Sequence, residues 1–253
     1  MLKKDEERSQ HTLLSHGLKV FAVLHMPKVR VGEKVPAVLF CHGFGGNKSG
    51  KFRLSVRQSE LLSNLGIASL RLDFRGSGDS EGDFKDTTIG TQLDDARVGL
   101  QFLLQLPQID VTRIGLLGRS LGGCIATHLA AEFTPLKALC LWVPVFDAVP
   151  WLAQYKGTDA APRFFGEKLS EECIAEFQEL TASQPLAKLA SVPLFLVRAG
   201  LDEVLGEYHH NKYLECRKNA DSLVLPQSNH EFANFEEQQT LLKATASWFS
   251  KSL

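Results

Sequence analysis

Residues 114–123 read Ile-Gly-Leu-Leu-Gly-Arg-Ser-Leu-Gly-Gly. The first four residues predict a short buried strand, and the apolar spacing from Leu121 onward predicts a helix, so the serine at position 120 falls on the turn between them. Such a turn is so sharp that a side chain two residues to either side of the serine would collide with it. Glycine stands at both positions, Gly118 and Gly122. We therefore predict that Ser120 projects above a strand end, beside a helix N-terminus that favours negative charge.

Apolar runs alternate with helical patterns on both sides of this turn. Near-continuous apolar strands separated by helices indicate a mainly parallel sheet covered on both faces. The predicted strands are residues 35–41, 67–73, 113–117, 138–143, 193–197 and 222–225, with 18–26 as an antiparallel edge. The predicted helices are residues 58–64, 91–105, 121–132 and 235–250. Because open sheets of this kind bind ligands beyond the carboxyl ends of their strands, residues that directly follow a strand are the candidates for function.

A glycine-rich loop, His42-Gly43-Phe44-Gly45-Gly46, follows the predicted strand 35–41. A tetrahedral oxyanion needs hydrogen-bond donors at the place where its charge develops, and the usual pair is the N–H after the nucleophile plus one from this early loop. We assign these donors to the backbone N–H groups of Leu121 and Phe44. His42 is interpreted as a residue that braces the loop by hydrogen bonding, and a role as catalytic base is the alternative.

A serine hydroxyl is a weak nucleophile unless a base takes its proton and an acid orients that base. Asp202 and His230 each lie on a loop beyond a predicted strand. The order Ser120, Asp202, His230 is the one expected for a nucleophile elbow of this kind. Glu203 and Asp147 are the competing acids. We predict that His230 is the base and that Asp202 orients it.

Other residues of chemically active types are assigned structural roles. His128 lies on the helix that follows the elbow, and His209 with His210 lies in a polar stretch that predicts a solvated helix. The glycine-rich segment 73–82 contains two serines, but no elbow motif surrounds either of them. This segment is interpreted as a turn that shapes the flank of the site.

The composition excludes several classes of protein. The 253 residues are 44% hydrophobic and 23% charged, which is ordinary for a globular chain, and we expect a single domain, 1–253. A formal net charge of -1 gives no pull toward nucleic acid or an anionic membrane. No secretory signal or apolar run long enough to span a bilayer is present, so the expected compartment is the cytoplasm. The five cysteines form no close pair and predict free, mostly buried thiols, and no metal-ligand cluster appears.

Residues 146–185 interrupt the alternation of strand and helix with an irregular helical pattern rich in aromatic residues. Long insertions of this kind are usually either functional or mobile. The segment is interpreted as a small helical cap over the sheet. The alternative, to which we give equal weight, is an excursion whose aromatic side chains only pack onto the body.

Taken together, these motifs resemble the α/β-hydrolase superfamily along nearly the whole chain, and within it bacterial esterases of the cinnamoyl or feruloyl esterase type. The likeness is carried by His-Gly-Phe-Gly-Gly-Asn-Lys at 42–48 and by Asp-Phe-Arg-Gly-Ser-Gly-Asp-Ser-Glu-Gly-Asp-Phe at 73–84. The resemblance implies the α/β-hydrolase fold, no cofactor or metal, and a small-molecule ester as substrate. It also implies a cap that grips the acyl group. The residues expected to contact substrate are His42, Gly43, Arg119, Asp147, Trp151 and Tyr155, with Asp159 as a further cap candidate.

The expected function is hydrolysis of carboxylic esters with small or aromatic acyl groups, through an acyl-enzyme. A thioesterase, a peptidase or amidase, and an acyltransferase would use the same three side chains, and the sequence does not separate them. The alternative from another class is a non-catalytic binding protein that kept the fold. The sequence leaves the oligomeric state open.

Overall fold

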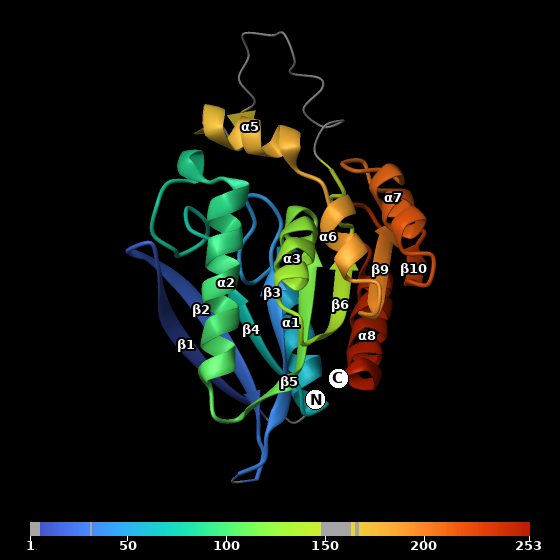
Figure 1. Cartoon of the computed structure of the whole chain (residues 1–253). Coiled ribbons are helices and arrows are strands. Elements are labelled where there is room, and N and C mark those ends of the chain that lie inside the picture. Colours follow the sequence, from blue (N-terminus) through green and yellow to red (C-terminus); the bar gives the residue numbers. More distant parts are fainter. Residues whose placement is uncertain (1–5, 31, 148–162, 165–166) are drawn as a thin grey trace.

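Eight strands form one sheet in the computed structural model, which describes residues 6–30, 32–147, 163–164 and 167–253. The order across the sheet is β1-β2-β4-β3-β5-β6-β9-β10 (Figure 1). The strands are β1 (Glu6–Ser15), β2 (Leu18–Pro27), β3 (Val35–Cys41), β4 (Ala68–Leu72), β5 (Ile109–Arg119), β6 (Leu136–Trp142), β9 (Leu194–Ala199) and β10 (Asp221–Leu225). All neighbours from β4 to β10 are parallel, whereas β2 is antiparallel to both β1 and β4. The predicted fold class, a mostly parallel sheet flanked by helices, is confirmed.

The edge of the sheet differs from the prediction. The segment 18–26 is antiparallel as predicted, but β1 lies outside it and forms the edge. β1 reads Glu-Glu-Arg-Ser-Gln-His-Thr-Leu-Leu-Ser, and only Leu13 and Ser15 are buried. An edge strand that faces solvent carries little apolar alternation, so its sequence gave no strand signal.

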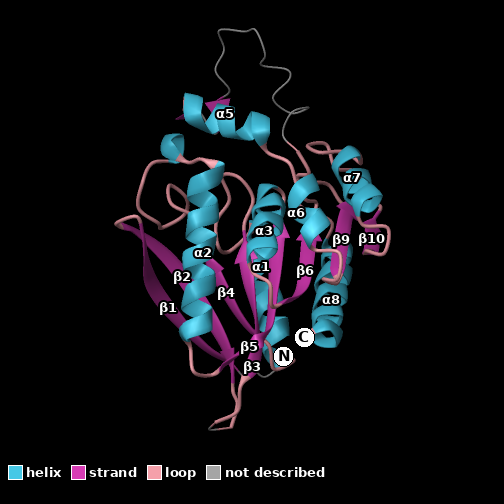
Figure 2. Ribbon diagram, in the orientation of Figure 1, coloured by secondary structure: helices cyan, strands magenta, loops and turns pink. Residues whose placement is uncertain are grey.

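Helices cover both faces of the sheet (Figure 2). The helices α1 (Leu54–Asn64) and α8 (Phe235–Ser252) pack on one face, and α2 (Ile89–Gln105), α3 (Leu121–Glu132), α6 (Ser183–Lys188) and α7 (Tyr208–Cys216) pack on the other. Two short 3₁₀ turns, η1 (Lys51–Arg53) and η2 (Phe84–Asp86), complete the body. All four predicted helices are present, α3 with its predicted bounds and the others longer. Within the described ranges, no helix is both long and apolar enough to cross a bilayer.

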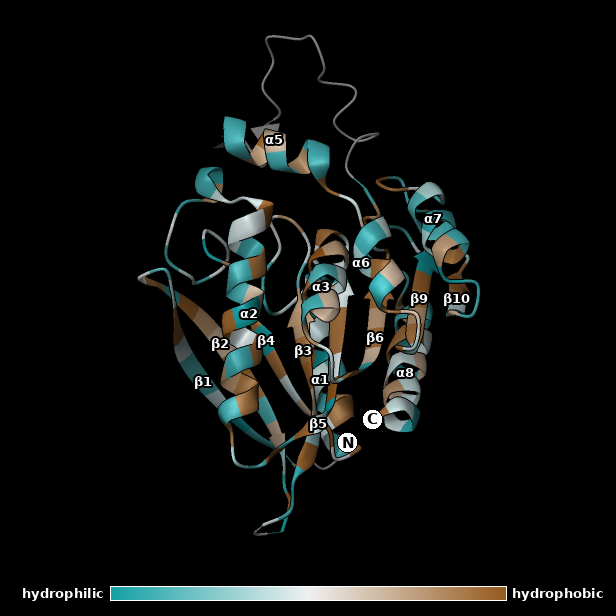
Figure 3. Ribbon diagram, viewed as in Figure 1, coloured by the Kyte–Doolittle hydropathy of each residue, from teal (hydrophilic) through white to brown (hydrophobic). Residues whose placement is uncertain are grey.

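The two layers of core follow from the alternation of side chains along the strands. In β3, Leu39 and Cys41 join the apolar cluster under α2 and α3, whereas Val38 and Phe40 join the cluster under α1 and α8. Successive side chains of a strand point to opposite faces, so a strand covered on both sides must be apolar throughout. Figure 3 shows this as hydrophobic strands between helices with hydrophilic outer faces.

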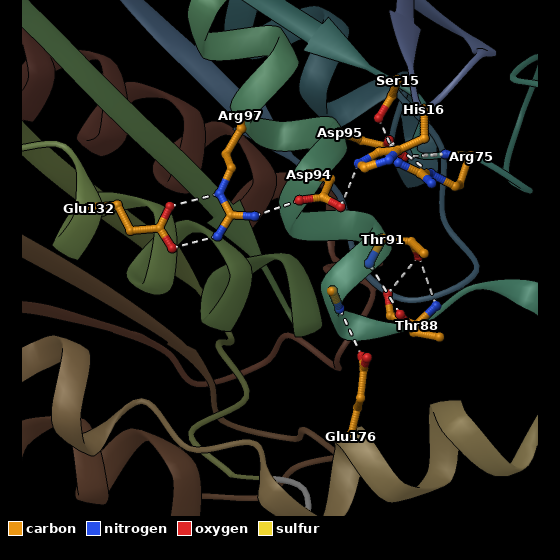
Figure 4. A network of polar contacts seen from close by, with 11 residues as sticks. Ser15, His16, Arg75, Thr88, Thr91, Asp94, Asp95, Arg97, Glu132 and Glu176 are labelled. Atoms are coloured by element: carbon orange, nitrogen blue, oxygen red, sulfur yellow. Dashed lines mark hydrogen bonds and ion pairs between the residues drawn. The ribbon is translucent and has the colours of Figure 1, made fainter.

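The predicted cap segment, 146–185, is described in part. Its described elements include β7 (Arg163–Phe164), β8 (Glu167–Lys168) and α5 (Glu171–Glu179), and α5 lies beyond the carboxyl ends of the strands (Figure 1). The Glu176 carboxylate of α5 accepts a hydrogen bond of 2.8 Å from the Gly90 N–H in the first turn of α2 (Figure 4). The positive end of a helix dipole favours a carboxylate there, so this contact holds α5 onto the body.

A polar network ties α2 to its neighbours (Figure 4). Arg97 of α2 donates to both carboxylate oxygens of Glu132 on α3, at 2.7 and 2.8 Å. The Asp95 carboxylate, which is fully buried, accepts hydrogen bonds from the Arg75 guanidinium at 2.6 and 2.9 Å. The second pair is shielded from water, so it stabilises the fold more than an exposed pair would, and it fixes the glycine-rich turn 73–82 against α2.

The helix α7 lies where a helix is predicted, but its histidines are not solvated. His209 and His210 are 4% and 6% exposed and face the body together with Tyr213. Their polar character concealed the buried face, because the side chains on that face are histidine and tyrosine rather than aliphatic residues.

We predict that His210 makes the fold sensitive to acid. Burial, assisted by Arg198, lowers the pKa of His210 to about 4, so the unfolded chain takes up a proton first as the pH falls below about 6.5. The stability that the neutral His210 side chain contributes is complete above about pH 6.5 and is lost as the pH falls toward about 4. Between pH 7 and 4.5, the free energy of unfolding of the wild type should fall by about 2 kcal/mol more than that of His210→Gln. Urea unfolding measures this, and Asn211→Gln, on the exposed side of the same helix, is the control. Equal acid losses in all three proteins would contradict the prediction.

Candidate active site

The turn between β5 and α3 places Ser120 above the sheet. Ser120 has φ 54° and ψ -125°, a conformation that L-residues adopt only when their surroundings enforce it. A Cβ at position 118 would lie 2.4 Å from the carbonyl oxygen of Gly122, and one at position 122 would lie 2.3 Å from the carbonyl oxygens of Cys41 and His42. Both contacts are sterically impossible, so the structure requires glycine at both positions.

Three distant side chains meet at this turn. His230 Nε2 lies 3.1 Å from Ser120 Oγ, and His230 Nδ1 lies 2.8 Å from Asp202 Oδ2. The side chains of His230 and Asp202 are 7% and 2% exposed. With a carboxylate on Nδ1, the ring carries its proton there and presents Nε2 as the acceptor for the serine hydroxyl. The arrangement can remove a proton from Ser120 as its oxygen attacks.

The Asp202 carboxylate is held as an anion by its surroundings. Burial would raise the pKa of Asp202, but the hydrogen bonds from His230 and from two backbone N–H groups, those of Val204 at 2.9 Å and Leu205 at 2.8 Å, lower it below its usual value. Three donors therefore fix the carboxylate in position, and the carboxylate in turn fixes the imidazole.

The competing acids occupy other positions. Glu203 Oε2 accepts a hydrogen bond of 3.3 Å from the backbone N–H of His230, not from the ring. Asp147 Oδ2 accepts a hydrogen bond of 3.0 Å from the Tyr208 hydroxyl. The imidazole of His230 is hydrogen-bonded to Asp202, the acid that the sequence order favours.

His42 braces the glycine-rich loop after β3. His42 Nδ1 donates to the Gly43 carbonyl oxygen at 2.8 Å, and the Gly46 N–H donates to the same oxygen at 2.9 Å. The other ring nitrogen, Nε2, accepts from the Phe74 N–H at 3.0 Å, and burial lowers the pKa of His42, which keeps the ring neutral. Because the C=O and N–H of one peptide plane point in opposite directions, fixing the Gly43 carbonyl fixes the direction of the Phe44 N–H.

The two expected oxyanion donors lie on segments in contact with the nucleophile. A Cβ at Gly43 would lie 3.1 Å from Ser120 Cβ, so the loop that carries Phe44 touches the serine. Leu121 is the first residue of α3, whose N-terminus has no side-chain cap, and the positive end of the helix dipole lies there. The ring of Phe44 packs against Phe84 and Phe177, with centroids 4.9 and 5.2 Å apart, which brings α5 over this loop.

Arg119 contacts the loop that carries the base. Its Nη2 donates to the His230 carbonyl oxygen at 2.9 Å and to Glu231 Oε2 at 2.8 Å. The sequence assigned Arg119 to substrate contact and did not single out Glu231. The position of Glu231 directly after His230 was the signal in the sequence that could have identified it.

Sequence reasoning also missed the charged pair behind the glycine-rich loop. The fully buried Asp73 carboxylate accepts from both the backbone N–H and the ammonium group of Lys48, and from the Asp79 N–H at 2.9 Å. Lys48 lies in the motif 42–48 and Asp73 lies in the motif 73–84. Both motifs were recognised in the sequence, but the sequence did not show that these two side chains form a pair.

The remaining substrate candidates have different outcomes. Trp151, Tyr155 and Asp159 lie outside the described residues. Asp147 lies at the start of the cap segment and pairs with Thr181 in an isolated β-bridge. Among the described residues, no group of His, Cys, Asp and Glu side chains could hold a metal ion.

The fold and the family match together place the chain among the serine hydrolases of the α/β-hydrolase superfamily, which confirms the resemblance drawn from the motifs. Residues 52–253 match the prolyl oligopeptidase family, and the chain belongs to that family.

Solved structures share the fold over nearly the whole chain. Est1E from Butyrivibrio proteoclasticus, solved with ferulic acid bound, is 24% identical and superposes with a TM-score of 0.84 over 96% of this chain and 98% of that one. The acylaminoacyl peptidase of Pyrococcus horikoshii is 19% identical, with a TM-score of 0.77 over 99% of this chain and 42% of that one.

Curated relatives match over about half of this chain. The mitochondrial palmitoyl-protein thioesterase ABHD10 of Bos taurus is 34% identical over 123 residues, which are 49% of this chain and 37% of the relative. The quorum-quenching protein AidA of Acinetobacter baumannii is 31% identical over 134 residues, which are 53% of this chain and 42% of the relative. The matched segments thus span less than half the length of these relatives.

We predict that Asp202 and Glu203, although adjacent, differ sharply in importance. Asp202→Asn should lower the kcat for a p-nitrophenyl ester by about 10⁴-fold, because the amide stabilises the wrong tautomer of the imidazole. Glu203→Gln keeps an oxygen that can accept from the His230 N–H and should lower kcat by less than about 10-fold. Steady-state kinetics of the two variants against the wild type measure both effects. The opposite ranking would show that Glu203 orients the base.

Proposed function

We propose that the protein hydrolyses carboxylic esters through an acyl-enzyme formed on Ser120. The observation that carries the proposal is the unbroken chain of hydrogen bonds from Ser120 Oγ through His230 to Asp202. A hydroxyl in line with a neutral imidazole and a buried carboxylate is activated for nucleophilic attack, and this constellation recurs on unrelated folds for acyl transfer.

The proposed mechanism uses these atoms in turn. His230 Nε2 takes the proton of Ser120 as Oγ attacks the ester carbonyl, and the backbone N–H groups of Phe44 and Leu121 donate to the resulting oxyanion. The imidazolium then gives its proton to the leaving alcohol, and the acyl group stays on Oγ. A water molecule, deprotonated by the same imidazole, releases the acid and restores the serine.

Small or aromatic acyl groups are the proposed substrate class. The aromatic rings of Phe44, Phe84 and Phe177 form an apolar cluster beside the loop that carries one oxyanion donor. Binding sites lined by aromatic side chains favour apolar groups of a ligand. Est1E, which shares this fold, was solved with ferulic acid, an aromatic acid.

The cap is part of the proposal. We propose one domain, residues 1–253, in which the segment 146–185 covers the site. The support is that α5 reaches the body at two points, Glu176 at the N-terminus of α2 and Phe177 on Phe44.

A second candidate function is thioester or amide hydrolysis by the same residues. One curated relative is a palmitoyl-protein thioesterase, and one structure of the same fold is an acylaminoacyl peptidase. Rates on an ester, a thioester and an anilide with the same acyl group separate the candidates. A preference for the thioester or the anilide would replace the ester proposal, and a preference for an alcohol acceptor over water would indicate an acyltransferase.

We predict that the wild type releases p-nitrophenol from a short p-nitrophenyl ester in a stoichiometric burst, and that Ser120→Ala has no burst. Loss of the nucleophile should lower kcat by about 10⁶-fold, leaving the residual rate supplied by oxyanion stabilisation and binding. Ser77→Ala is the control, because Ser77 is a buried serine that stands in the turn 73–82, outside the nucleophile turn. Stopped-flow absorbance measures the burst. A burst that persists in Ser120→Ala would overturn the proposal.

A further inference from the structure

A cavity of about 520 Å³ lies against the glycine-rich loop that follows β3. Its walls are the loop 42–48, the segment 50–53 and the side chains of Arg71, Arg119 and Glu231, and Ser120 does not line it. The cavity therefore adjoins the neighbours of both the nucleophile and the base, and it shares the residues of the loop 42–48 with the candidate active site.

The lining of this cavity is strongly cationic. Its cationic side chains are those of Lys48, Lys51, Arg53, Arg71 and Arg119, and its acidic side chain is that of Glu231. Lys48 is neutralised by Asp73 and Asp79, and Arg119 by Glu231. Within the described part of the chain, no salt bridge joins Lys51, Arg53 or Arg71 to a carboxylate. Three positive charges at the cavity thus have no carboxylate in direct contact, and Arg71 reaches the Glu6 carboxylate only through the His25 ring.

The most unusual of these charges is Arg71, which is 3% exposed. Its Nη1 donates to the Lys48 carbonyl oxygen and its Nη2 lies 2.8 Å from His25 Nε2, so both partners are neutral groups. Burial lowers the pKa of His25 to about 4, which keeps that ring uncharged at neutral pH. The buried Arg71 Nε–H has no acceptor in the part of the chain that the structure describes. A buried guanidinium is costly unless an anion compensates it.

The electrostatics around Arg71 show that its charge is compensated only in part. Burial lowers the pKa of Arg71 to about 10, and the positive charges of Arg8 and Arg53 lower it further, whereas the carboxylates of Asp73 and Glu6 raise it. The group is still cationic at neutral pH, so the cavity keeps a positive potential that an anion would relieve.

The N-terminus of α1 adds to the positive potential. This helix of 11 residues starts directly after Arg53, and no side chain caps it. Phe52 and Arg53 have φ angles of 53° and 59°, which are strained for residues with a Cβ and hold the chain around the cavity in an enforced shape. Helix N-termini next to cationic side chains are places where proteins bind oxyanions.

We propose that this cavity binds a compact oxyanion, a carboxylate or phosphate group, held by Arg71 and Arg53 at the N-terminus of α1. The group comes either from an acidic ester substrate or from a free anion in solution, and only the first source rests on the proposed esterase function. Because Arg71 donates to the Lys48 carbonyl, an anion held by Arg71 is linked through that side chain to the loop that carries the Phe44 N–H.

The first arm of the test measures binding of inorganic phosphate by calorimetry and by thermal unfolding. The wild type should bind phosphate saturably, and the double variant Lys51→Gln/Arg53→Gln should bind it at least about 10-fold more weakly, because two of the three unpaired charges are gone. The control is Arg30→Gln/Lys34→Gln, which removes the same charge from the loop between β2 and β3 at the opposite end of the sheet (Figure 1). Arg71→Met should abolish phosphate binding, provided that circular dichroism shows this variant to be folded. If Arg71→Met does not fold, phosphate binding by Lys51→Gln/Arg53→Gln tests the proposal.

The second arm distinguishes the two sources of the anion. The kcat/KM for the p-nitrophenyl monoester of glutaric acid is divided by that for p-nitrophenyl butyrate. If the anion belongs to the substrate, this ratio should fall at least about 5-fold in Lys51→Gln/Arg53→Gln but not in the control. Phosphate should then inhibit hydrolysis of the acidic ester and not of the neutral ester. An unchanged ratio with a phosphate effect on the neutral ester identifies a free anion.

Absence of saturable phosphate binding, with the same ester ratio in the wild type, the double variant and the control, would overturn the anion site. Phosphate binding in a protein that hydrolyses neither ester would leave the site standing and would refute the proposed function instead.

Discussion

Direct contact between two backbone segments, the β5–α3 turn and the end of β3, is the constraint on which the site depends. A Cβ at Gly122 would lie 2.3 Å from the carbonyl oxygens of Cys41 and His42, so the two segments touch with no room for a side chain. This contact sets the nucleophile and the loop with the oxyanion donor in one rigid unit. Catalysis by electrostatic stabilisation needs donors that are already in place when charge develops, and close backbone packing provides that without reorganisation.

Charged side chains around the site hold this unit and the base in fixed relative positions. Asp73 and Arg71 fix Lys48 at the end of the glycine-rich loop, while Arg119, next to the serine, bonds to the carbonyl of His230. A residue beside the nucleophile is thereby tied to the base itself. Buried polar groups with satisfied partners rigidify a site. The Arg71 Nε–H, which has no acceptor among the described residues, belongs to a residue that lines the cavity of the proposed anion site.

The sequence predicted the features that depend on local pattern. The parallel strands, the elbow at Ser120 and its two required glycines follow from apolar runs and steric limits, and the order of Asp202 and His230 followed from their places after strands. It missed β1, because a solvent-facing edge strand has little alternation, and it misjudged the exposure of His209 on α7 because a buried face made of histidine and tyrosine looks polar. Contacts between distant charges, such as Lys48 with Asp73, depend on the tertiary fold and leave no periodic trace.

Every step of the proposed reaction needs Ser120 to be an activated nucleophile in the folded protein. Reaction with a fluorophosphonate probe, followed by peptide mass spectrometry, tests this most directly because the probe bonds only to a serine whose proton can be taken by a neighbouring base. We expect a single covalent adduct on Ser120 that disappears when the protein is unfolded before exposure to the probe. A folded protein with Ser120 unmodified, or with its adduct on another serine, would contradict it.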